Sequence, residues 1–150
     1  MRAADTLPRV GQATKVQEIQ ENKMDIARKN YEGIPRTGSP HFHAVRAGNL
    51  LFLAGATAKM TPAENGTMGE QTRVILERMK KIMESEGGSL SDIVKITSYV
   101  TDLSPEAKSE TQKVRMEFFG DDLPASTRVE VAGLDGPNLL IEIDGIAVIS

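Results

Sequence analysis

The segment 123–149 constrains the fold most, because polar and apolar residues alternate along it in two runs. Residues 126–132 read Ser-Thr-Arg-Val-Glu-Val-Ala, and residues 139–149 place isoleucines opposite acidic residues. Successive side chains of a β-strand point to opposite faces of a sheet. We therefore expect two strands joined by a turn, with one apolar face toward a core. The other face should carry Arg128, Glu130, Glu142 and Asp144, and a charged face at this place suggests a site or an interface.

Length and composition indicate a single globular domain with its own core. Of the 150 residues, 39% are hydrophobic and 26% are charged, and the net charge of −3 does not favour nucleic acid or acidic membranes as partners. The absence of cysteine excludes disulfides, thiolate metal sites and a cysteine nucleophile. No run is long and apolar enough for a membrane span or a secretory signal, so a cytoplasmic protein is expected.

Residues 1–40 are expected to form an N-terminal arm and loop, and the domain proper is expected over 41–150. A weak helix over Thr14–Lys29 is one interpretation of the arm. The other is a solvated arm, or a helix packed loosely on a neighbour. Glycines and prolines between 33 and 40 then predict a loop before the domain begins near His41.

Four elements are predicted between residue 41 and the two last strands. A hairpin over 42–55 turns at Gly48-Asn49, and a strand covers 93–101. A helix starts at the capping-box spacing of Thr67 and Glu70 and ends near Glu86. Ser104-Pro105 begins a second helix that stops at Gly120. The predicted inner positions of these two helices are Met68, Ile75, Met79, Ile82, Met83, and Ala107, Thr111, Val114, Phe118.

The order β-β-α-β-α-β-β predicts an α+β fold in which two helices cover one face of a single sheet. No helix remains for the other face of that sheet. This face must meet water or copies of the same chain, and its small residues and paired charges suit a homo-oligomer.

Four segments resemble the Rid/YjgF family of reactive-intermediate imine and enamine deaminases. These segments are 47–55, 92–103, 124–131 and 140–148, and the similarity covers about 41–149. The last two segments together are a specific signature. The resemblance implies a chorismate mutase-like fold and a homotrimeric barrel with clefts between subunits. It also implies a small, carboxylate-bearing substrate and no cofactor.

The resemblance implies that Glu142 is the glutamate linked to water activation and proton transfer in the deaminating members. The arginine that holds the substrate carboxylate in those members is replaced here by Ser126. Arg128 is two residues further along the same strand, hence on the same face as Ser126, and a guanidinium grips a carboxylate in a bidentate manner. Two interpretations stay open: Arg128 holds the substrate anion, or it pairs with Glu130, Glu142 or Asp144 across the sheet and holds the trimer together.

Four further residues are candidates for the site, either from the resemblance or from their chemistry. His41 takes the place of a tyrosine beside the family's cleft, where it could bind substrate or shuttle a proton. Together with His43 it forms a His-x-His pattern, but no third ligand is evident and we expect no metal site. Gln112 falls near a polar cleft residue of the family. Gly55 matches the cleft floor or is simply a tight bend.

Three classes of function remain open from the sequence. The first is a hydrolase that deaminates an imine or enamine, such as 2-iminobutanoate or 2-iminopropanoate. The second is a non-enzymatic trimer that binds small ligands, which the missing arginine favours. The third is a nuclease or translation inhibitor, which the acidic balance and the 4% aromatic content argue against.

Overall fold

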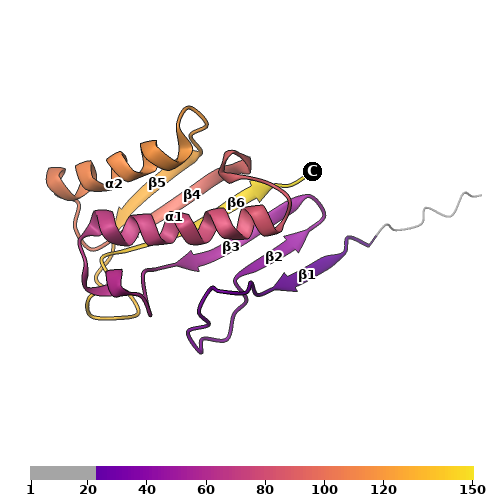
Figure 1. The fold of residues 1–150 in the computed structure, drawn as a ribbon, viewed down its shortest axis with the longest axis horizontal. Helices are drawn as coiled ribbons and strands as arrows, with labels where there is room; N and C mark the ends of the chain where they lie inside the picture. Colours follow the sequence, from indigo (N-terminus) through magenta and orange to yellow (C-terminus); the bar gives the residue numbers. More distant parts are fainter. Residues whose placement is uncertain (1–22) are drawn as a thin grey trace, which may run out of the picture.

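The structure is a computed structural model that describes residues 23–150. Within this part of the chain, one six-stranded sheet is covered on one face by two helices (Figure 1). The strands are β1 Ile26–Lys29, β2 Ala44–Ala47, β3 Leu50–Ala56, β4 Ile93–Val100, β5 Ala125–Glu130 and β6 Ile141–Val148. The helices are α1 Met68–Ser85 and α2 Pro105–Phe119, with 3-10 turns η1 Pro62–Asn65 and η2 Leu90–Asp92. The predicted α+β class is confirmed.

The strand order is β1-β2-β3-β6-β4-β5, which corrects the predicted pairing of the last two strands. β6 lies between β3 and β4 and is antiparallel to both, whereas β5 lies at the edge, parallel to β4. The hairpin predicted for 123–149 is therefore wrong, although both strands exist. Alternation identifies a strand but not its neighbour, and the β4-α2-β5 connection is a crossover that places β5 beside β4.

The predicted helix signals are confirmed. Thr67 accepts from the Glu70 backbone N–H and Glu70 reaches back to the Thr67 N–H, so the capping box is present. Ser104 caps α2, because its hydroxyl accepts from the Ala107 backbone N–H, and all five predicted inner residues of α1 are buried. The predicted inner residues of α2 are also buried or packed against the core, although Phe118 is only half-buried and its ring lies beneath the Arg73 guanidinium. Phe119, which was not predicted, is buried.

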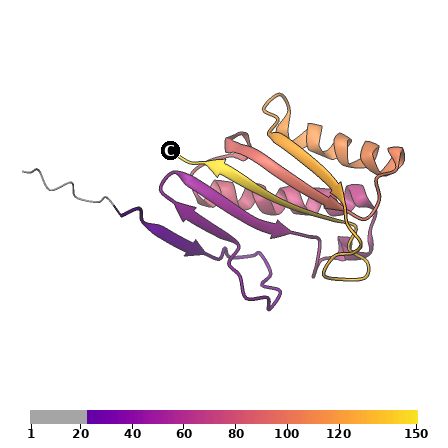
Figure 2. The ribbon, with the colours of Figure 1, turned by 180° about the vertical axis from the view of Figure 1, so that it is seen from behind.

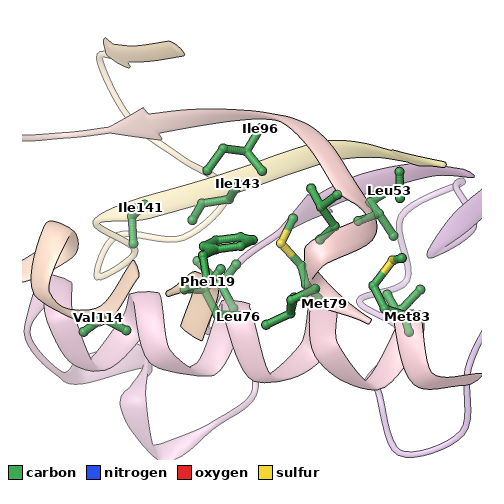
Figure 3. Packing of buried hydrophobic residues seen from close by; sticks show 14 of the residues in the cluster. Leu53, Leu76, Met79, Met83, Ile96, Val114, Phe119, Ile141 and Ile143 are labelled. Carbon is green, nitrogen blue, oxygen red and sulfur yellow. The ribbon is translucent and has the colours of Figure 1, made fainter. Parts of the chain in front are cut away.

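The core lies between α1, α2 and the covered face of the sheet (Figure 3). Leu76, Met79 and Met83 of α1 face isoleucines of β4 and β6. The ring of Phe119, the last residue of α2, lies among them. The α1 methionines are thus core residues, as their helical spacing predicted. This packing fixes β6, the strand that carries Glu142, in the middle of the sheet.

The sheet begins at Ile26, before the domain boundary predicted near His41. β1 pairs with β2, so the helix proposed over Thr14–Lys29 is wrong for 26–29, and its part before residue 23 lies outside the described residues. β1 is short and mostly exposed, which leaves no apolar alternation to detect. It is held by Glu86, whose carboxylate accepts from Lys29 at 2.7 Å, Tyr31 at 2.8 Å and Arg46 at 3.1 Å.

The opposite face of the sheet is not covered by a helix in the part of the chain that the structure describes (Figure 2). We call it the open face. It carries the polar residues Tyr99, Glu142 and Asp144, and the Tyr99 hydroxyl donates to Asp144 at 3.1 Å. Large apolar side chains are also exposed there: Leu50, Phe52, Val129 and Val148.

Candidate active site

A cavity of about 340 Å³ lies where β3 ends, beside the segment that connects β1 to β2. Its walls come from that segment, from the end of β3, from α1, from the loop before β6 and from β6 itself. Three predicted site residues meet in it, namely His41, Gly55 and Glu142. The cavity is also lined by Pro35, Arg36, Thr37, His43, Lys59, Arg78 and Asp135.

Glu142 is the central ionisable group of this cavity. It is the second residue of β6, and its strand is anchored by the buried Gln71 of α1, which donates to the Asn138 carbonyl and accepts from the Leu140 N–H. Burial raises the pKa of the Glu142 carboxyl, the nearby Asp144 and Asp135 raise it further, and His41 opposes the shift. Within residues 23–150 no ion pair neutralises this carboxylate. A carboxyl with a raised pKa and no cationic partner can both accept and return a proton.

Gly55 makes room for the Glu142 carboxyl. The β3–β6 register is interrupted between Leu53 and Ala56, so the strand bulges beside Glu142. A Cβ atom built at Gly55 would overlap the Glu142 carboxyl group. The predicted role of Gly55 as a floor residue therefore has a steric cause: only glycine leaves the carboxyl its present position.

The two histidines differ in their contacts. His41 is exposed at the cavity, and its Nδ1 lies 3.1 Å from the Phe42 carbonyl. His43 is held on both ring nitrogens, because Nδ1 accepts from the Tyr31 N–H at 3.1 Å and Nε2 faces the Pro35 carbonyl at 3.3 Å. These partners place the proton of a neutral ring on Nε2, and burial lowers the pKa of His43. His43 thus fixes the loop, whereas the His41 ring is exposed at the cavity.

The cations of the cavity wall were not predicted from the sequence. The Arg78 guanidinium donates to the carbonyls of Thr57 and Lys59, and the Lys59 ammonium lies 3.0 Å from the Asp135 carboxylate. Both cations therefore hold the loop after β3. No motif marks Arg78, which is one of several charged residues along α1.

Arg128 is on the opposite side of the sheet from Glu142, which corrects the predicted charged face. It pairs with the buried Ser98 in the β4–β5 register, whereas Glu142 lies opposite Tyr99. Its guanidinium donates to Thr111 Oγ1 of α2 at 2.8 Å and lies 3.6 Å from the Met68 sulfur. No carboxylate among residues 23–150 of the same chain forms an ion pair with Arg128, so the alternative pairing across the sheet is not formed within one subunit.

Ser126 and Gln112 lie with Arg128 rather than with Glu142. Ser126 is exposed on β5, paired in register with Ile96, and Gln112 is exposed on α2. Neither residue lines the cavity. The predicted residues therefore form two groups within one chain. His41, Gly55 and Glu142 share the cavity, while Gln112, Ser126 and Arg128 lie along α2 and β5.

Among residues 23–150, no three His, Cys, Asp or Glu side chains come close enough together to hold a metal ion. Of the helices in this same range, none has the length and apolarity required to cross a bilayer.

Comparison with known proteins places the chain in a family. Residues 34–149 match the family model described as Endoribonuclease L-PSP. A RutC family protein of Pyrococcus horikoshii is 40% identical over 119 residues, which are 77% of this chain and 92% of that protein. A protein of Acinetobacter baylyi named 3-aminoacrylate deaminase RutC is 32% identical over 122 residues, 77% of this chain and 92% of that one.

The fold agrees with this match. A crystal structure from Mycobacterium tuberculosis, described as a member of the YjgF/YER057c/UK114 family, superposes with a TM-score of 0.69 at 29% identity. The superposition covers 83% of this chain and 100% of that one. Fold and site together define a two-layer α+β domain with an open sheet face and a cavity around Glu142. The chain belongs to the Rid/YjgF family, as its resemblance predicted, and this family includes proteins named as deaminases.

Proposed function

We propose that this protein hydrolyses a small imine or enamine and releases ammonia. The observation that carries the proposal is the Glu142 carboxyl, which has a raised pKa, no cationic partner among residues 23–150 and a position in a cavity beside the exposed His41. The deaminase name of the relative from Acinetobacter baylyi supports the same chemistry.

The reaction needs one water molecule and one proton shuttle. The Glu142 carboxylate takes a proton from water as the water oxygen bonds to the imine carbon, and it delivers that proton to the nitrogen. A second proton then passes from the new hydroxyl group to the nitrogen, the C–N bond breaks, and a carbonyl product and ammonia leave. An enamine first accepts a proton on carbon from the carboxylic acid form of Glu142. The raised pKa favours the carboxylic acid form more than in an ordinary glutamate, which suits a group that both accepts and returns a proton.

The anion of the substrate is held by Arg128 of a neighbouring subunit in this proposal. Within one chain Arg128 and Glu142 lie on opposite faces of the sheet, so they form one site only where two copies meet. A homotrimer with clefts between subunits, as the family resemblance implies, would bring Arg128 of one subunit close to Glu142 of the next. The exposed apolar residues of the open face, Leu50, Phe52, Val129 and Val148, support an interface there.

An imine-hydrolysis assay tests the proposal. An amino-acid oxidase generates 2-imino acids in place, and the rate of keto-acid release is followed with and without this protein. Wild type should accelerate release, and Glu142→Gln should reduce kcat/KM by about a hundredfold or more. Asp144→Asn, on the same strand and face, is the matched control and should keep most of the activity. Equal activity of wild type and Glu142→Gln would contradict the proposal.

A second candidate is a trimer that binds small ligands without turning them over. The specific observation in its favour is Ser126, which stands where the deaminating members have the arginine that holds the carboxylate. Saturable binding of a small carboxylate, combined with no acceleration of imine hydrolysis for any amino acid tested, would favour this candidate.

A further inference from the structure

Two arginines lie next to each other where α2 packs on β5. Arg128 of β5 donates to Thr111 of α2, and Arg115 is four residues after Thr111, hence on the same face of the helix one turn along. Both side chains are half-buried. Burial lowers the pKa of the Arg128 guanidinium, and the positive charge of Arg115 lowers it further.

Neither guanidinium is neutralised by the described part of the chain. Among residues 23–150 no carboxylate forms an ion pair with Arg115 or Arg128, and the Nε atom of each is buried without a hydrogen-bond partner. Asp102 is close enough to act on Arg128, but its oxygens accept from the Ser104 N–H at 2.7 Å and the Ser104 hydroxyl at 2.9 Å. That carboxylate is engaged in the start of α2.

The other two half-buried arginines among residues 23–150 have partners, which sets this pair apart. Arg46 pairs with Glu86, and Arg78 donates to two backbone carbonyls. Two adjacent guanidiniums that lack a counter-charge repel each other and cost free energy through their partial burial. Such an arrangement is stabilised when an anion with two negative charges binds.

We propose that Arg115 and Arg128 together bind two negative charges, so that the substrate is an imino or enamino acid with a second anionic group. This inference rests on the proposed function, because it uses Arg128 as the anion-holding residue of that site. One carboxylate of the substrate occupies one guanidinium. The second group, a side-chain carboxylate or a phosphate, occupies the other. Arg115 is then the residue that determines specificity for dianions.

Calorimetric titration of the full-length protein with keto acids, the products of such a reaction, tests this inference. The probes are 2-oxoglutarate with a second carboxylate, 3-phosphohydroxypyruvate with a phosphate, and 2-oxohexanoate with neither. One of the two dianionic probes should bind about tenfold or more tightly than 2-oxohexanoate, as expected for an added charge-assisted contact. Which dianion is preferred identifies the second group.

Substitution of Arg115 separates specificity from general binding. Arg115→Gln should abolish the preference for the dianion and leave the affinity for 2-oxohexanoate unchanged. Lys113→Gln removes an exposed positive charge from the same helix on another face, and it should retain the preference. Equal affinities of all probes for wild type would overturn the inference, as would an Arg115→Gln variant that keeps the preference. Loss of oligomer without a change in affinity would assign Arg115 to a subunit contact instead.

These outcomes are separable from those of the proposed function. The titrations require no turnover, so a dianion preference can be present in a protein that does not deaminate imines. Conversely, deamination of simple 2-imino acids with no dianion preference would retain the proposed function and overturn the role of Arg115.

Discussion

Glu86 and Glu142 are both shielded from solvent, but their neighbours shift the pKa values of the two carboxyl groups in opposite directions. The Glu86 side chain is 2% exposed, and burial alone would raise its pKa. Hydrogen bonds from Lys29, Tyr31 and Arg46 outweigh this effect and hold the pKa below its usual range. Glu142 faces Asp144 and Asp135 instead, and its pKa is raised.

The opposite pKa shifts of Glu86 and Glu142 suit the two residues to different roles. A carboxylate satisfied by three donors is fixed in its charged form and joins β1 to the end of α1. A carboxyl without a cationic partner can change its protonation state, which is the property a proton shuttle needs. Burial by itself therefore does not identify a carboxyl group that can exchange protons. The charge of the neighbouring groups must be considered as well.

The largest effect is expected when the space around Glu142 is changed. Gly55→Ala places a methyl group where the Glu142 carboxyl lies, so the carboxyl must move. Displacement of a catalytic group by about 1 Å can cost about a hundredfold in rate, and we expect such a loss in kcat/KM for imine hydrolysis. Gly133→Ala is the control, because no atom lies within 4 Å of its added methyl group. Full activity of Gly55→Ala would show that the position of Glu142 is unimportant.

A smaller effect, on stability rather than activity, is expected at Glu86. Glu86→Gln removes the charge that Lys29 and Arg46 share, and should lower the free energy of unfolding by about 2 kcal/mol at pH 7. Chemical denaturation measures this value. Glu84→Gln, at an exposed position near the end of α1, should change the free energy of unfolding little.

The pH dependence gives the Glu86 prediction its sign. The pKa of Glu86 is lower in the folded protein than in the unfolded chain, where it is about 4.3. Its stabilising contribution is therefore complete above that value and is lost as the pH falls through the folded pKa. The difference between wild type and Glu86→Gln should shrink in acid. A difference that stays constant down to pH 3 would contradict the assignment.

The smallest effect is expected from a neighbour of Glu142. If the carboxylate form of Glu142 accepts the proton of water, activity falls as the pH drops through its raised pKa, so the acidic limb of the kcat/KM profile reports that pKa. Asp144→Asn removes a negative charge that raises it. The limb should shift toward lower pH by less than about one unit. An unchanged limb would mean that another group controls the profile.

The sequence predicted the local features of this fold well. The capping box of α1, the Ser104-Pro105 start of α2 and the apolar stripe of α1 depend on residues within a few positions of one another, so they can be read from the chain. The pairing of β5 with β4 depends on the crossover through α2, and no local pattern encodes it. The four-residue β1 has no apolar alternation and was missed for that reason.

The site was predicted in part, for the same physical reason. The positions of Gly55 and Glu142 relative to each other follow from neighbouring strands, and the structure brings both into the cavity with His41. Arg128 was assigned to the wrong face because its orientation follows from the parallel register with β4. No motif marks Arg115, and the lack of a hydrogen-bond partner for its buried Nε within residues 23–150 follows from the packing of α2 and not from a local pattern.

Subunit mixing tests most directly the central claim that Glu142 and Arg128 of different copies form one site. Glu142→Gln and Arg128→Glu are each expected to be inactive as purified proteins. When the two variants are denatured together and refolded at equal amounts, about one quarter of the clefts in a random homotrimer combine an intact Glu142 with an intact Arg128 from the neighbour. The account predicts that imine hydrolysis returns to about that fraction of the wild-type rate. A mixture as inactive as its two components would contradict it.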